Sequence, residues 1–187
     1  MRWLINLKIP TFTFEIFQTI QLTSSFMDNH PELKNSIITD FAEAYSNFGL
    51  NPLMGRIIAL LIISKDPQSL DDITEKLEMS KGPISQICRR LKERNLIESV
   101  WVPGDRKDYY KASEDIFGQA FQNQKAKMSR NIQIAKKYAD IAKDMNGDDE
   151  QYAYKRMREI QSFYELMDEH NEQFLKAWKS KLAELRN

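Results

Sequence analysis

Cysteine, histidine and long apolar runs are scarce in this sequence of 187 residues. The single cysteine, Cys88, excludes an internal disulfide framework, which favours a reducing compartment. The two histidines, His30 and His170, lie too far apart in the sequence to offer a local zinc-ligand spacing. No apolar run reaches the roughly 18 residues that span a bilayer, so we expect a soluble, cytoplasmic protein.

An excess of charge of one sign is also missing, because 27 basic residues balance 27 acidic ones. This balance argues against a wholly basic nucleic-acid coat protein but leaves room for a local basic patch. We find no Gly-rich phosphate loop, no recognisable Ser/His/Asp set and no metal cluster, so we predict neither an enzyme nor a cofactor. Glycine and proline are few, at six each, and the abundance of Leu, Ile, Lys, Glu and Ala predicts a mainly α-helical fold.

The first 26 residues differ in composition from the rest of the chain, being rich in Thr, Ile and Phe and poor in charge. Lys8 and Pro10 interrupt the apolar segment that a secretory signal would need. Because Met27 stands just before the first patterned helix, we interpret residues 1–26 as an extension, either a misassigned start or a disordered segment. The alternative is a functional arm or an extra dimerisation segment.

From Pro31 the apolar residues recur at helical spacing. A first helix is predicted from Pro31 to about Gly49, with an apolar stripe of Leu33, Ile37, Phe41, Ala44 and Phe48. Asn51-Pro52 then has the pattern of a helix cap and a first-turn proline. The helix that follows, through Ile62, is apolar nearly all round and should be the buried centre of the domain.

Residues 69–94 have the pattern of two helices joined by a tight turn. Ser69 and Asp72 resemble a capping box at the start of the first helix. Ser80 can cap the second helix, where Pro83 falls in the tolerated first turn. The second helix has an inward apolar set and a polar face opposite it. The inward set is Ile84, Ile87, Cys88 and Leu91, and the polar face carries Gly82, Ser85, Gln86 and Arg89.

After Asn95 the period of the apolar pattern changes from 3.6 to 2. Residues 97–102 and 107–111 are predicted strands, and Pro103-Gly104-Asp105-Arg106 supplies the turn between them. The segment from Lys81 to Lys111 contains eight basic and four acidic residues, so it is locally positive. A helix-turn-helix followed by a basic-tipped hairpin, or wing, is typical of DNA-reading domains, and we predict this domain over residues 27–115.

The chemistry of base recognition suggests a role for each exposed polar residue. Arg can form a bidentate contact with guanine and Gln with adenine, so Arg89 and Gln86 are the predicted base-reading residues. Phosphate contacts are assigned to the start of the helix, and Arg106 is placed in the minor groove with Asp105 orienting it. The complete predicted DNA-binding set is Ser80, Lys81, Ser85, Gln86, Arg89, Arg90, Arg106 and Lys107. The alternatives are an ordinary solvated basic face, and a winged-helix adaptor that binds proteins without touching DNA.

The C-terminal part, residues 116–187, is predicted to form a helical dimerisation region. A near-heptad apolar stripe runs from Ala153 to Leu185, which is too long for a small domain's own core. A partner helix from a second subunit is the simplest explanation.

The run from Leu60 to Tyr110 resembles the MarR-like winged-helix transcription regulators, most closely the GbsR-type branch of glycine betaine synthesis regulators. The resemblance rests on residues 69–73 and 79–82, and above all on the wing 101–110, Trp-Val-Pro-Gly-Asp-Arg-Lys-Asp-Tyr-Tyr. Pro83 departs from the family pattern by stiffening the start of the second helix. The resemblance implies a homodimer that binds a palindromic operator in double-stranded DNA, with terminal helices forming the dimer interface.

Some members of that branch are similar in sensing quaternary ammonium compounds, which aromatic faces attract by cation–π interaction. The residues that could form such an effector site are Trp101, Tyr109, Tyr110, Phe117, Phe121 and Tyr138. Aromatics at this spacing more often belong to a core. Cys88 could likewise be a redox sensor, but its inward position favours a small buried hydrophobe with a blunted thiol.

Overall fold

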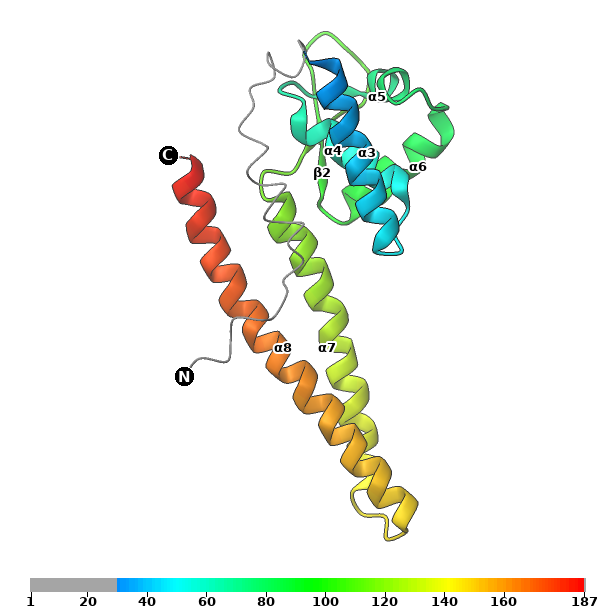
Figure 1. The fold of residues 1–187 in the computed structure, drawn as a ribbon, viewed down its shortest axis with the longest axis vertical. Helices are drawn as coiled ribbons and strands as arrows, with labels where there is room; N and C mark the ends of the chain where they lie inside the picture. The colour runs from blue at the N-terminus through cyan, green and yellow to red at the C-terminus, as the bar shows by residue number, and fades with distance from the viewer. Residues whose placement is uncertain (1–29, 187) are drawn as a thin grey trace. The chain divides into compact units, whose positions relative to one another are not determined.

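The computed structural model describes residues 30–186, so the extension predicted for residues 1–26 lies outside the described residues. The chain divides into two compact units, with the boundary between Ser113 and Glu114 (Figure 1). Among residues 30–186, no helix combines the length and the apolar character needed to cross a bilayer.

The first two helices of the first unit contribute much of its core, and both begin where the sequence predicts. Helix α3 spans Pro31–Asn47 and helix α4 spans Pro52–Ile63, each with proline in its first turn. The Asn51 side chain accepts a hydrogen bond of 2.8 Å from the backbone N–H of Leu53, which caps α4. Helix α4 is buried over most of its surface, because helices and strands pack against it on several sides.

Helices α3 and α4 approach each other closely at Gly55. A Cβ atom added to Gly55 would lie 2.4 Å from the backbone oxygen of Phe41. The buried stripe of α3 consists of Ile38, Phe41 and Ala44, whereas the predicted Phe48 is exposed. Phe48 is the C-cap residue, so the chain has already left the helical path at that point.

The helix-turn-helix and its wing complete the first unit. Helix α5 spans Leu70–Lys76 and helix α6 spans Lys81–Glu93. Strands β2 (Ile97–Val100) and β3 (Tyr109–Ala112) form the antiparallel wing. A third strand, β1 (Gln68–Ser69), pairs with β3, so the sheet order is β1-β3-β2. The sequence did not predict β1, because two residues are too few to show an alternating pattern.

The second unit is a pair of long helices, α7 (Ile116–Ala142) and α8 (Asp148–Arg186), which pack along each other. Three contacts across the pair involve residues of the α8 apolar stripe. They are the ring pairs Phe121–Phe174 and Phe117–Trp178, with centroids 4.6 and 6.4 Å apart, and a 2.9 Å contact from Asn171 Nδ2 to Met128 Sδ. This part of the stripe therefore has its partner helix in the same chain, which corrects our expectation that a second subunit supplies it.

A different set of apolar side chains stays exposed on the second unit. Ile134, Tyr138 and Ile141 recur at i, i+4 and i+7 and therefore share one face of α7. Phe163 and Leu166 are more than half exposed on α8. Exposed aromatic and aliphatic side chains at helical spacing are typical of a surface that packs against a partner.

Candidate nucleic-acid interface

The outer face of α6 carries the residues predicted to read DNA bases. Ser85, Gln86, Arg89 and Arg90 are all exposed. The opposite face is closed, since Ile84, Ile87, Cys88 and Leu91 are buried against the rest of the unit. The amphipathic pattern therefore fixes the rotation of α6 and presents its polar side chains to solvent.

The start of α6 is open, as the insertion of a helix into a groove requires. Lys81, Gly82 and Pro83 are exposed, and a Cβ added to Gly82 would meet no atom within 4 Å in the described structure. Ser80 is the N-cap residue, but within the described part of the chain its hydroxyl makes no capping hydrogen bond. Among the described residues, Ser80 therefore occupies the predicted N-cap position without making the predicted capping hydrogen bond. Its side chain lies at the exposed start of the helix.

The turn before α6 is held from inside the unit. Arg56 Nη2, on the otherwise apolar α4, donates a hydrogen bond of 3.0 Å to the carbonyl oxygen of Leu77 at the end of α5. Glu78 follows with a φ of 51°, in the left-handed region that reverses the chain direction. This contact anchors the turn to the buried helix and so positions α6.

The wing is shaped by Asp105. Its carboxylate accepts a hydrogen bond of 3.0 Å from the backbone N–H of Lys107 and one of 2.9 Å from the Tyr109 hydroxyl. These two bonds, the backbone one first, lower the pKa of Asp105. We expected Asp105 to orient the Arg106 side chain, but its carboxylate binds mainly the Lys107 backbone and the Tyr109 hydroxyl, and it interacts with Arg106 through the backbone N–H. Asp105 therefore orders the wing backbone, and the Arg106 side chain is exposed.

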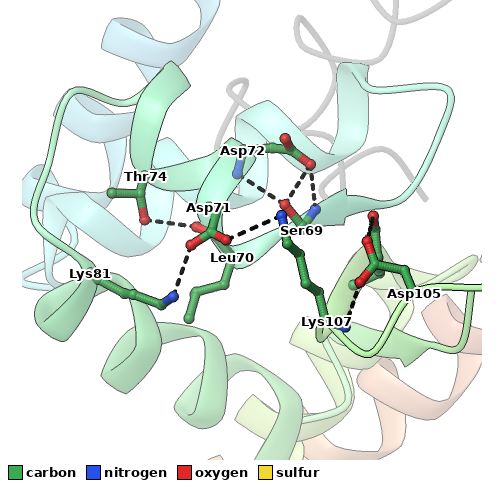
Figure 2. A network of polar contacts seen from close by, with 9 residues as sticks. Ser69, Leu70, Asp71, Asp72, Thr74, Lys81, Asp105 and Lys107 are labelled. Carbon is green, nitrogen blue, oxygen red and sulfur yellow. Dashed lines mark hydrogen bonds and ion pairs between the residues drawn. The ribbon is translucent and has the colours of Figure 1, made fainter.

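One carboxylate connects the start of α6 with the wing. Asp71 Oδ1 lies 2.8 Å from Lys81 Nζ, and Asp71 Oδ2 lies 3.4 Å from Lys107 Nζ (Figure 2). The two ammonium groups, Lys81 first, lower the pKa of Asp71. The structure thus brings Lys81 and Lys107 together, two residues that the sequence had placed separately on the helix and the wing.

Sequence reasoning missed the role of Asp71. The helix dipole already accounts for an acidic residue in the first turn of a helix, so the sequence offered no reason to predict that Asp71 pairs with lysines elsewhere. Its two partners lie on other elements, and no periodic pattern connects residues that distant.

The predicted aromatic cage is not assembled within either unit. Phe117 and Phe121 pair with rings of α8, while Tyr138 lies 17 residues beyond Phe121 on the same helix, roughly 25 Å away at 1.5 Å per residue. In the first unit Trp101 is 76% exposed, and the Tyr109 hydroxyl is bound to Asp105. Tyr110 is buried in the central strand of the sheet.

Cys88 lies in the core, as its inward position predicts. Its side chain is fully buried, and this burial raises the pKa of the thiol to about 11. A thiol with such a pKa is a poor nucleophile at neutral pH. In the described residues, no group of His, Cys, Asp and Glu side chains is arranged to hold a metal ion.

Comparison with known proteins identifies the domain. Residues 48–108 match the family model described as MarR family. The chain is 31% identical over 81 residues to the HTH-type transcriptional repressor OpcR of Bacillus subtilis, covering 43% of this chain and 44% of that protein. It is 27% identical over 97 residues to the HTH-type transcriptional repressor GbsR of the same organism, covering 49% and 53%.

A solved structure shares the fold. The crystal structure of a transcriptional regulator aligns with a TM-score of 0.67 at 21% identity, covering 79% of this chain and 98% of that one. The chain spans about half the length of the Bacillus relatives it matches, and those relatives are named as regulators of transcription rather than enzymes. The mainly helical fold with its three-stranded sheet agrees with these matches. Residues 48–108 of this winged-helix fold therefore match the MarR family, and the Bacillus relatives that the chain resembles are named as transcriptional regulators.

Proposed function

We propose that this protein is a sequence-specific DNA-binding transcriptional regulator that works in the cytoplasm. The observation that carries the proposal is the exposed polar face of α6 in the same compact unit as a wing that bears Arg106 and Lys107. The major groove of DNA admits an α-helix, and an adjacent hairpin can reach the phosphates or the neighbouring minor groove. The names of its relatives, which describe repressors and regulators of transcription, support the proposal.

The exposed face gives each predicted contact residue a role in the proposal. Gln86 and Arg89 read base edges, because they are exposed on the outer face of the helix. Ser80, Lys81, Ser85 and Arg90 hold phosphates around that helix, and Lys107 does so from the wing. Arg106 enters the minor groove from the wing.

The proposal includes a homodimer acting on a palindromic operator. The exposed apolar side chains of α7 and α8, which the helix pair leaves uncovered, support a second copy as the partner. A twofold dimer would present two α6 helices to two half-sites, and a palindromic site matches that symmetry.

We also propose regulation by a small-molecule effector, with fewer candidate binding residues than the sequence suggested. Of the six aromatic residues considered, Trp101 and Tyr138 are exposed. Tyr138 already has the Lys137 ammonium 5.3 Å from its ring centroid, so its face is able to attract a cation. A quaternary ammonium effector would quench or shift the tryptophan fluorescence on titration with choline, whereas an unchanged spectrum and unchanged DNA affinity would contradict this part of the proposal.

The main proposal is tested by measuring DNA binding to the region upstream of the protein's own gene. A DNA reader binds that duplex in the presence of unrelated competitor, and its affinity falls steeply between about 50 and 200 mM salt. An adaptor that binds only proteins would give no retarded complex at micromolar protein. That result would favour the adaptor and contradict the DNA-binding function.

A further inference from the structure

The carboxylate of Asp71 lies between two side chains that are proposed to contact DNA phosphates. Lys81 begins helix α6 and Lys107 belongs to the wing, and Asp71 pairs with both, one oxygen to each. Figure 2 shows the two lysine side chains converging on Asp71 from α6 and from the wing. A carboxylate, like the phosphodiester group of DNA, carries one negative charge shared over two acceptor oxygens.

We propose that Asp71 acts as an internal phosphate substitute and lowers the sequence-independent part of the domain's affinity for DNA. This inference rests on the proposed DNA-binding function and deepens it. Asp71 itself is not assigned a contact with a base. It acts through Lys81 and Lys107, whose charge it offsets before any DNA arrives.

Sequence-independent affinity for DNA comes mainly from the release of counterions by phosphate-binding lysines and arginines. A lysine that is already paired with a carboxylate of the protein contributes less to this release, because it must leave the carboxylate before it can bind a phosphate. Base contacts from Gln86 and Arg89 are not affected in the same way, since those side chains extend from the outer face of α6. Asp71 therefore weakens the attraction to the phosphates of any DNA sequence and leaves the base contacts in place.

The position of Asp71 is determined by its neighbours. The preceding residue, Leu70, donates its backbone N–H to the carbonyl oxygen of Asp108 at 3.2 Å, which ties the start of α5 to the wing. The following residue, Asp72, is bound to Ser69 in the capping box, so its carboxylate is held at the start of α5. Pairing of β1 with β3 holds the same end of α5 against the sheet.

The ion pairs remain open to exchange with DNA. The side chains of Asp71, Lys81 and Lys107 are 50%, 62% and 54% exposed, respectively. Exposed ion pairs of this kind are weak, because water and salt screen them. The lysines can therefore leave Asp71 when a phosphate approaches.

The test compares Asp71→Asn with Glu75→Gln in the full chain. Glu75 lies one helical turn after Asp71 on α5, is exposed, and makes no ion pair among the described residues, so its substitution changes net charge equally without touching the lysines. Fluorescence anisotropy measures binding to a labelled duplex of mixed sequence at several salt concentrations. Circular dichroism verifies that each variant is folded, and Asp71→Ser is a second variant that removes the same charge.

We expect Asp71→Asn to bind the mixed-sequence duplex several-fold more tightly than the wild type. The slope of log affinity against log salt should steepen by up to about 1.8, since each of the two freed lysines adds about 0.9. Glu75→Gln should behave nearly as the wild type does. The gain from Asp71→Asn should disappear when Lys81 and Lys107 are both replaced by Met.

Two negative results are distinguishable. If the wild type binds DNA but Asp71→Asn matches Glu75→Gln in affinity and slope, the inference about Asp71 is wrong and the proposed function stands. If neither the wild type nor any variant binds a duplex at low salt, the proposed function and this inference both fail.

Discussion

The hydroxyl of Tyr109 donates a hydrogen bond of 2.9 Å to Asp105, which links the strand leaving the wing to the turn at its tip. The same carboxylate accepts from the backbone of Lys107, so the loop between β2 and β3 is closed on itself by two bonds. A turn with Pro103 and Gly104 at its centre, where Gly104 has a φ of 84°, completes the tip.

Tyr109→Phe should raise the pKa of Asp105 toward the usual value for aspartate without restoring it fully. The backbone N–H of Lys107, the larger cause of the lowered pKa, remains in the variant. Because the folded pKa is lowered, these bonds stabilise the wing above the ordinary carboxyl range and are lost as pH falls through the folded pKa. Carbon-13 NMR titration of the Asp105 carboxyl measures the midpoint, and Tyr152→Phe in the second unit is the control. An unchanged midpoint in Tyr109→Phe would contradict the assignment.

Asp72→Ala should destabilise the folded state at pH 7 by about 1 kcal/mol, because it removes the N3 carboxylate of the capping box while Ser69 still caps the helix. Asp72 accepts from both the hydroxyl and the backbone N–H of Ser69, and its hydrogen bond with the hydroxyl is the largest cause of its lowered pKa. The difference from wild type should shrink as pH falls through that lowered pKa, because the wild-type carboxylate then gains a proton. Urea unfolding at several pH values measures the difference, with Asp66→Ala as an exposed control. If wild type and Asp72→Ala still differed in free energy of unfolding below the folded pKa of Asp72, the stabilising role of the ionised carboxylate would be contradicted.

Arg89→Ala and Lys107→Ala should weaken DNA binding in different ways. We expect Arg89→Ala to reduce affinity for a site selected from random DNA by roughly 5- to 150-fold, the range of one bidentate base contact. Lys107→Ala should weaken selected and unrelated DNA alike and lower the salt slope by up to about 0.9. Anisotropy titrations with both duplexes make the comparison. Equal losses on both duplexes for both variants would show that the division of roles is wrong.

The Cys88 thiol should react slowly in the folded protein. With a pKa of about 11, about one thiol in a thousand is ionised at pH 8, far fewer than for an unperturbed cysteine. Labelling by a thiol reagent should therefore be at least about 100-fold faster in denaturant than in buffer. Rapid labelling of the native protein, or DNA binding that changes with mild peroxide, would support a redox sensor instead.

Phe163→Glu should dissociate the proposed dimer while leaving each chain helical. Phe163 is 58% exposed on α8, so a charge there disturbs a partner surface more than the chain's own core. Ser162→Glu is the matched control, since it adds the same charge about 100° around the helix. Light scattering after gel filtration gives the mass of each variant. A monomeric wild type, or a Phe163→Glu variant that remains dimeric, would exclude this surface as the interface.

Local signals predicted much of the first unit from sequence. The Asn51-Pro52 start of α4 and the capping box of α5 are encoded by residues within three positions of each other, and the structure confirms both. The apolar period likewise predicted which face of α6 is buried. Such patterns are readable because a helix repeats its geometry every few residues.

Contacts between distant residues were not predictable in this way. The periodicity of α8 indicated an apolar stripe but could not tell whether a second subunit or α7 packs against it. The structure shows that α7 contacts the stripe at Asn171 and Phe174. The spacing of Phe117 and Phe121 could not distinguish paired core rings from a ligand cage. The bridge from Asp71 to two lysines depends on the packing of the wing against α5, which only the folded chain displays.

The close approach of α3 and α4 at Gly55 limits how this sequence can vary. The atom that a larger side chain would meet is the backbone oxygen of Phe41, and a helix backbone cannot rotate away as a flexible side chain can. Even alanine would have to push the two helices apart and open the core that surrounds α4. A redesigned domain, or a chimera with a homologous sequence, should therefore take α3 and α4 from the same parent protein.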